Sequence, residues 1–164
     1  MMRTILLLLS VTFGVSAAAL AQAPATESLG SSCTLENHVY RCDGAGFAKA
    51  LASAKSAAVE AQNVDAYARD QLKKMIAGKY GKQVVEQGGG SPDLIFLIIP
   101  VGVDGINISP GEPTLGSLRV YSATPEGGRD HLLWAETYNG PQDLPWPAVV
   151  RSLILQFQKH FPAK

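Results

Sequence analysis

The chain has 164 residues, of which 14 are basic and 14 acidic, so its formal net charge at neutral pH is 0. This balance gives no electrostatic footprint for nucleic acid or for an anionic membrane. Hydrophobic residues make up 46% of the sequence, and a chain of this length can bury a core without metal ions or several disulfides.

The first 21 residues have the pattern of a secretory signal peptide. Arg3 supplies a positive charge, residues 5–19 are mainly apolar, and the small-x-small sequence Ala19-Leu20-Ala21 follows. These features in that order are typical of a cleaved signal. An uncleaved membrane anchor is the weaker interpretation, because polar and small residues dilute the apolar stretch. We therefore predict a secreted or periplasmic mature chain that starts near Gln22, with a net charge near −1 after loss of Arg3.

The mature chain is predicted to be one domain. Residues 22–32 are rich in Pro, Ala, Ser and Gly without periodicity, which favours a flexible lead-in. The single α+β domain is then expected to span residues 33–164, a length typical of one domain.

Cys33 and Cys42, the two cysteines of the chain, are predicted to form a structural disulfide across a hairpin. Eight residues separate them, an even number, as directly opposed positions around a two-residue turn require. A turn at Asn37-His38 pairs Leu35 with Tyr40 and places the cysteines in a non-hydrogen-bonded pair, within disulfide reach. A C-x-x-C redox site needs closer cysteines, and zinc would need two more ligands. Export would keep the bridge oxidised.

Helical patterns precede the central strands. Residues 45–61 begin with helix-favouring composition, and we expect a short helix that yields to a strand. A longer helix is expected to have Asn63 as its N-cap and to end at Gly81. One apolar stripe of this helix contains Val64, Ala68, Leu72, Met75 and Ile76.

Strand patterns follow a possible short strand at 82–86. Residues 94–99 form an aliphatic run without alternation, which indicates a central strand covered on both faces and is too short to span a membrane. Leu118, Arg119 and Val120 alternate, which predicts a half-buried strand. A turn at 125–128 is expected to join it to a strand at 131–138 as an antiparallel hairpin.

The C-terminal helix has the strongest pattern. Pro147 lies in its first turn and Pro162 ends it. Its polar face has too few cations for an amphipathic membrane helix, so we predict that its apolar stripe faces the core. The stripe contains Trp146, Val149, Val150, Leu153, Ile154, Phe157 and Phe161.

Together these elements predict an α+β fold: a mainly antiparallel sheet with two long helices packed on one face, plus the disulfide-linked hairpin. The order of a helix, the strand SPDLIFLII, two further strands with Val120 and Leu133-Trp134, and a helix ending at Phe161-Pro162 resembles uncharacterised bacterial periplasmic and envelope domains of unknown function. The resemblance covers roughly residues 63–162. The chain departs from those domains because it lacks a lipid-bearing cysteine and adds the Cys33–Cys42 segment. The resemblance implies a fold and a compartment, and it transfers no catalytic residue.

The sequence contains no recognisable motif for catalysis, metal binding or cofactor binding. No G-x-S-x-G nucleophile elbow occurs. The glycine-rich loop with Asp104, Asn107 and Glu112 lacks the spacing of a calcium loop. The histidines, which lack metal-ligand spacing, are His38, His131 and His160. We therefore expect no catalytic residue, no metal ion and no cofactor.

Trp134, Glu136 and Tyr138 are the most suggestive side chains, because strand alternation places all three on one sheet face. If the helices cover the opposite face, this row is exposed and is a possible binding face. The favoured interpretation is a solvated edge strand whose aromatic rings pack on neighbouring residues.

Three functions remain open. A binding or envelope-assembly module, with an envelope protein or a small ligand as partner, is favoured by strong core patterning without a reactive motif. A hydrolase would need a site assembled from distant residues. A carrier would hold a small apolar ligand between sheet and helices.

Overall fold

The computed structural model describes residues 32–36, 39–61, 65–86, 89–100, 116–138, 140–141 and 143–163. The predicted signal peptide, His38, Asn63 and the three polar residues of the glycine-rich loop lie outside these ranges. Among the residues described, none of the helices has the length and apolar character that a membrane crossing requires. The elements in chain order are β1 (Cys33–Glu36), β2 (Val39–Cys42), α1 (Gly44–Ser53), β3 (Ser56–Ala61), α2 (Ala66–Lys74), η2 (Met75–Lys79), β4 (Gln83–Val85), β5 (Leu94–Pro100), β6 (Gly116–Ala123), β7 (Arg129–Thr137) and α3 (Trp146–His160).

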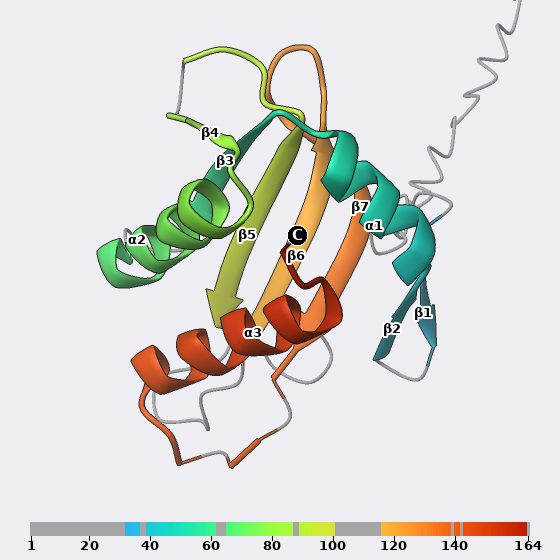
Figure 1. Ribbon diagram of the computed structural model, residues 1–164. Coiled ribbons are helices and arrows are strands. Elements are labelled where there is room, and N and C mark those ends of the chain that lie inside the picture. The colour runs from blue at the N-terminus through green and yellow to red at the C-terminus, as the bar shows by residue number, and fades with distance from the viewer. Residues whose placement is uncertain are drawn as a thin grey trace, which may run out of the picture.

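The main sheet is mixed, with five strands in the order β4-β3-β5-β6-β7 (Figure 1). β3 runs parallel to β4 and to β5, whereas β6 runs antiparallel to β5 and to β7. The prediction of a mainly antiparallel sheet is therefore only partly right. The difference arises at α2, because a helix that connects β3 to β4 returns the chain to the same end of the sheet.

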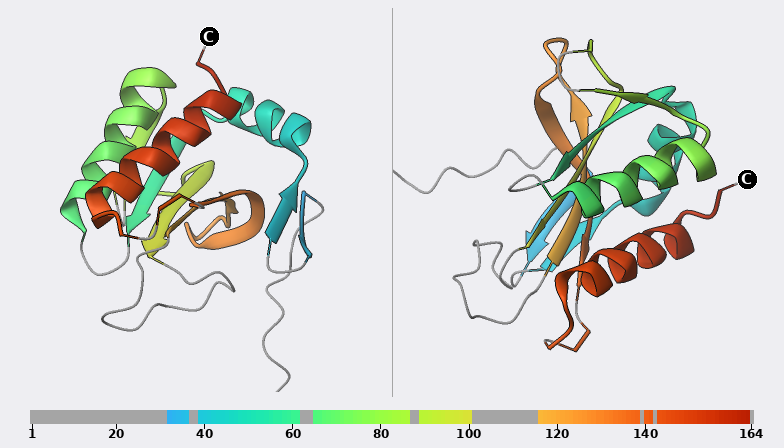
Figure 2. Two further views of the ribbon diagram at one scale, coloured as in Figure 1. Left: turned by 90° about the horizontal axis from the view of Figure 1, so that it is seen from below. Right: turned by 90° about the vertical axis from the view of Figure 1, so that its left-hand side faces the viewer.

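Three helices, and not two long ones, pack on one face of this sheet (Figure 2). α1 has 10 residues and contacts β7, α2 has 9 residues and lies over β3 and β5, and α3 has 15 residues and lies over β6 and β7. The expected short helix that yields to a strand is confirmed as α1 followed by β3.

α2 begins two residues later than predicted, because Asp65 is its N-cap. The carboxylate Oδ1 of Asp65 accepts a hydrogen bond of 3.1 Å from the Ala68 N–H, as expected of a helix cap. Its Oδ2 accepts another from the indole N–H of Trp146, at the start of α3. One carboxylate therefore caps α2 and ties it to α3.

After α2 the backbone widens into the π-helical turn η2, which the sequence pattern did not predict. Gly81 follows with a φ of 62°, a left-handed conformation that glycine adopts without strain. The predicted end of this helical segment at Gly81 is therefore confirmed.

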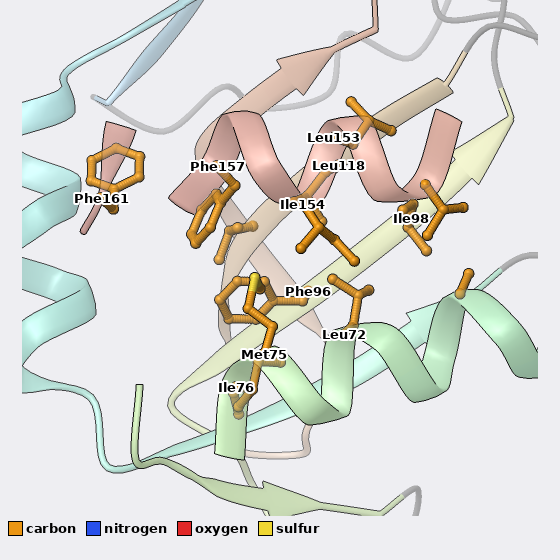
Figure 3. Packing of buried hydrophobic residues seen from close by; sticks show 14 of the residues in the cluster. Leu72, Met75, Ile76, Phe96, Ile98, Leu118, Leu153, Ile154, Phe157 and Phe161 are labelled. Carbon is orange, nitrogen blue, oxygen red and sulfur yellow. The ribbon is translucent and has the colours of Figure 1, made fainter. Parts of the chain in front are cut away.

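The main core lies between the three helices and the sheet (Figure 3). The predicted inward stripe of α3 is confirmed, since Leu153 and Phe157 are fully buried against strand residues such as Phe96 and Leu118. Gly116 lets α3 approach β6 closely: a Cβ there would lie 2.8 Å from the Trp146 ring and 2.9 Å from a Val149 methyl.

The hairpin of β1 and β2 has the predicted register, with Cys33 opposite Cys42 and Leu35 opposite Tyr40. A disulfide joins the two cysteines, whose Cα atoms are 4.0 Å apart. The hairpin packs on the sheet face that the helices leave free, where Cys33 and Tyr40 join a cluster of strand residues. The members of that cluster are Ile95, Leu97, Tyr121 and Leu132.

The hairpin contributes to covering β6 on its second face. Arg119 is 6% exposed, and its guanidinium lies 5.3 Å from the centre of the Tyr40 ring. The prediction that β6 is half-buried is therefore wrong, because alternation within one strand does not reveal which other segment covers its polar face.

Candidate functional site

The predicted row of Trp134, Glu136 and Tyr138 lies on the helix-covered face of the sheet. Tyr138 is 3% exposed and belongs to the main core, and Trp134 packs against it. The Trp134 ring stacks with Phe47 of α1 at 5.8 Å and meets Phe161 edge-on at 4.7 Å. The possible exposed binding face is therefore not formed, because α1 and α3 cover the face to which these residues point. The aromatic rings pack on neighbouring residues, as the favoured interpretation has it.

Glu136 joins this row to one of the histidines. Its Oε1 accepts hydrogen bonds from the Trp134 indole N–H at 3.0 Å and from His160 Nδ1 at 2.5 Å. The Glu136 side chain is 9% exposed, whereas that of His160 is 52% exposed. A buried carboxylate thus fixes the orientation of an imidazole that reaches the surface, and it connects the end of α3 to β7.

A surface groove begins at this imidazole. Its volume is about 550 Å³, within the size range of small-molecule sites. Three segments line it: α1, the chain around the end of η2, and the residues that follow α3. The lining residues are Ala48, Lys49, Leu51, Ala52, Lys79, Tyr80, Lys82, His160, Phe161, Pro162 and Ala163. We call this feature the lysine groove.

The lining of the lysine groove contains cations and buried apolar residues, and we call the buried apolar residues its floor. Lys49, Lys79 and Lys82 contribute three positive charges, and the lining contains no aspartate or glutamate. Leu51 and Phe161, which are 6% and 8% exposed, form the apolar floor. Oriented cations over an apolar surface favour a ligand that is anionic at one end and apolar at the other.

Tyr80 has a structural role in this groove. Its hydroxyl donates a hydrogen bond of 2.6 Å to the Phe161 carbonyl, which ties the end of η2 to the end of α3. Burial raises the pKa of Tyr80 to about 12. The phenol therefore stays protonated at neutral pH and is not suited to act as a base.

Lys82 is the most enclosed cation of the groove. It is 8% exposed, and its ammonium donates a hydrogen bond of 2.6 Å to the carbonyl of Ala54, just after α1. Burial lowers the pKa of Lys82, and the negative charge of Asp93 opposes that effect. The hydrogen bond to Ala54 therefore holds the Lys82 side chain beside the end of α1.

A second hollow, of about 800 Å³, lies beside β3 and the turn at 125–128, and cations outside its lining balance two of its three glutamates. Glu60 in its lining pairs with Arg129 at 3.4 Å, and Glu86 pairs with Lys73 at 2.6 Å. This balance gives the second hollow less power than the lysine groove to select a charged ligand.

The described histidines and cysteines considered as site residues from the sequence do not form one common site. His131 is exposed on β7, and its Nε2 lies 3.6 Å from Asp130 Oδ1. It takes no part in the Glu136–His160 pair. Within the described ranges no group of three or more His, Cys, Asp or Glu side chains is placed to hold a metal ion. The disulfide cysteines lie in the hairpin and line neither hollow.

The sequence analysis missed the lysine groove altogether. The groove takes its cations from two segments of the chain, one with Lys49 and the other with Lys79 and Lys82. The two segments are separated by roughly thirty residues, about the length of a whole βαβ unit. The one local signal is the pair Lys79 and Lys82, which flanks the glycine that ends the helical segment.

Comparison with protein-family models, curated protein sequences and solved structures gives no match to this chain. The resemblance to bacterial envelope domains therefore stays a prediction.

Proposed function

We propose that this protein is a non-catalytic binding module of the bacterial envelope, and that the lysine groove is its binding surface. The observation that carries the proposal is the composition of the groove: three lysines, no carboxylate and an apolar floor. A cluster of one charge sign in a concave surface raises the local concentration of ligands of the opposite sign. The partner is therefore an anionic ligand or an anionic segment of another envelope protein.

Two features support the envelope as the compartment. The Cys33–Cys42 disulfide persists in oxidising compartments such as the periplasm. The N-terminal residues have the order of charge, apolar stretch and small residues that export signals share.

The role of the groove is tested with three probes: dodecanoate, a hexaglutamate peptide and acetate. Isothermal titration calorimetry should detect binding of dodecanoate or of hexaglutamate, with acetate as the control that has a carboxylate and no further part. The matched variants are Lys79→Glu, which reverses a charge in the groove, and Lys74→Glu, which reverses an exposed charge outside it. Loss of binding in Lys79→Glu but not in Lys74→Glu supports the proposal, and equal binding by both variants contradicts it.

A hydrolase is the second candidate, and the Glu136–His160 pair is the observation that favours it. A carboxylate that orients an imidazole is part of many acid–base sites. The groove lining, however, contains no serine, threonine or cysteine that could act as a nucleophile. If the pair is catalytic, His160→Gln should abolish hydrolysis of a panel of ester and amide substrates; if no wild-type activity is found, the pair is structural.

A further inference from the structure

The environment of Lys82 identifies the part of a ligand that the groove would hold most firmly. An ammonium group has three N–H donors. For Lys82, the carbonyl of Ala54 is the one acceptor at hydrogen-bond distance among the described residues. The residue as a whole is nevertheless only 8% exposed. A buried cation with spare donors is stabilised by an anionic acceptor, because unpaired donors and charges away from water are costly.

The remaining lining favours a hydrocarbon chain over a peptide. Ala48, Leu51 and Ala52 belong to α1 and lie beyond its first turn, so their N–H groups bond within the helix. The Phe161 N–H bonds to the Phe157 carbonyl, and the Phe161 carbonyl accepts from Tyr80. Pro162 has no N–H. An extended peptide would find few backbone partners here, whereas an alkyl chain needs none.

From these two observations we propose that the lysine groove binds a long-chain carboxylate, that is, a fatty acid. The carboxylate accepts hydrogen bonds from the Lys82 ammonium, and the alkyl chain lies along the apolar floor formed by Leu51 and Phe161. This inference rests on the proposed function, since it names the ligand class of the same groove.

Charge and shape agree with this assignment. The charge of Asp93 already acts on Lys82, but the Lys82 ammonium has spare N–H donors from which a single carboxylate can accept. Lys49 and Lys79 are exposed and attract the ligand without enclosing it. The groove is open to the surface, so the end of the alkyl chain can leave it. Contact of the chain with Leu51 and Phe161 gains free energy in proportion to the apolar area removed from water.

The test compares dodecanoate with two ligands that each lack one half of it, dodecanol and butanoate. Dodecanoate should bind at least about tenfold more tightly than either, because both the charged hydrogen bonds and the apolar contact contribute. Lys82→Met should weaken dodecanoate binding by about tenfold or more, and should leave dodecanol binding unchanged.

A second pair of variants does not touch the Lys82 hydrogen bond. Ala52→Trp places a large side chain in the groove at an exposed position of α1, and Ala45→Trp places the same side chain on α1 outside the lining. Ala52→Trp should abolish dodecanoate binding and Ala45→Trp should not. This pair keeps the proposal testable if Lys82→Met fails to fold.

The outcomes separate the ligand class from the function of the groove. If hexaglutamate binds in a manner that depends on Lys79 but dodecanoate does not bind, the fatty-acid assignment is overturned and the binding module stands. If dodecanoate binds equally to the wild type and to Ala52→Trp, it binds elsewhere and the assignment is wrong. If no probe binds in the groove, both proposals fail.

Discussion

Replacement of Leu153 by alanine should strongly destabilise the protein, and the same replacement at Leu155 should not. Both residues lie on α3, two positions apart, but Leu153 is 0% exposed while Leu155 is 64% exposed. Removing a fully buried leucine side chain loses its transfer free energy and leaves a cavity, which together cost about 2–5 kcal/mol. At an exposed helical position, leucine and alanine differ by less than about 0.5 kcal/mol.

Urea unfolding followed by circular dichroism measures both effects on the free energy of unfolding. We expect the unfolding midpoint of Leu153→Ala to fall well below that of the wild type, with an unchanged slope, because the surface exposed on unfolding stays the same. Leu155→Ala should unfold with the wild type. Equal midpoints for the two variants would show that the stripe of α3 does not face the core, and would refute the assignment of this helix to the core.

Three further predictions concern the hairpin, the start of β5 and the N-terminus. Replacing Cys33 and Cys42 together by alanine should lower the free energy of unfolding by roughly 2–3 kcal/mol, the chain-entropy value for so short a loop; a loss below about 1 kcal/mol in urea unfolding would contradict a structural disulfide. Hydrogen bonds from the backbone N–H groups of Lys55 and Ser56 hold the pKa of Asp93 below its usual value. Its folded pKa is depressed, so the stabilisation is present above about pH 4 and is lost as the pH falls through the folded pKa. The difference in melting temperature between wild type and Asp93→Asn should therefore be constant near neutral pH and shrink below about pH 4; a difference that grows on acidification would show the wrong sign. N-terminal sequencing of exported protein should begin near Gln22, and a membrane-bound product that retains Met1 would contradict cleavage.

The features that the sequence predicts well are those set by local constraints. The parity of the Cys33–Cys42 spacing fixes the hairpin register, because opposed positions around a two-residue turn can pair in one way. The seven apolar residues of the predicted stripe, six in α3 and Phe161 just after it, repeat at helical spacing, which leaves one orientation toward the sheet.

The features that were missed depend on contacts between distant segments. Strand direction in the sheet follows from the crossover through α2, and alternation within a strand gives no direction. Arg119 and Glu136 are polar and alternate with apolar residues, yet both are buried, because the hairpin covers one and α3 brings His160 to the other. Only the tertiary arrangement decides which face of a strand is exposed.

The lysine groove could not be predicted for the same reason. Its cations lie on α1 and around the end of η2, and its floor includes residues that follow α3. No spacing in the sequence relates these segments, so the clustering of charge arises from packing.

The most direct test of the lysine groove as the binding surface is a titration of ¹⁵N-labelled protein with dodecanoate, followed by two-dimensional NMR. Binding in the groove predicts saturable shift changes concentrated on its lining residues, which are 48, 49, 51, 52, 79, 80, 82 and 160–163. Shift changes concentrated instead on residues 58–61, 90–92 and 125–128, which line the second hollow, would contradict the lysine groove as the binding surface.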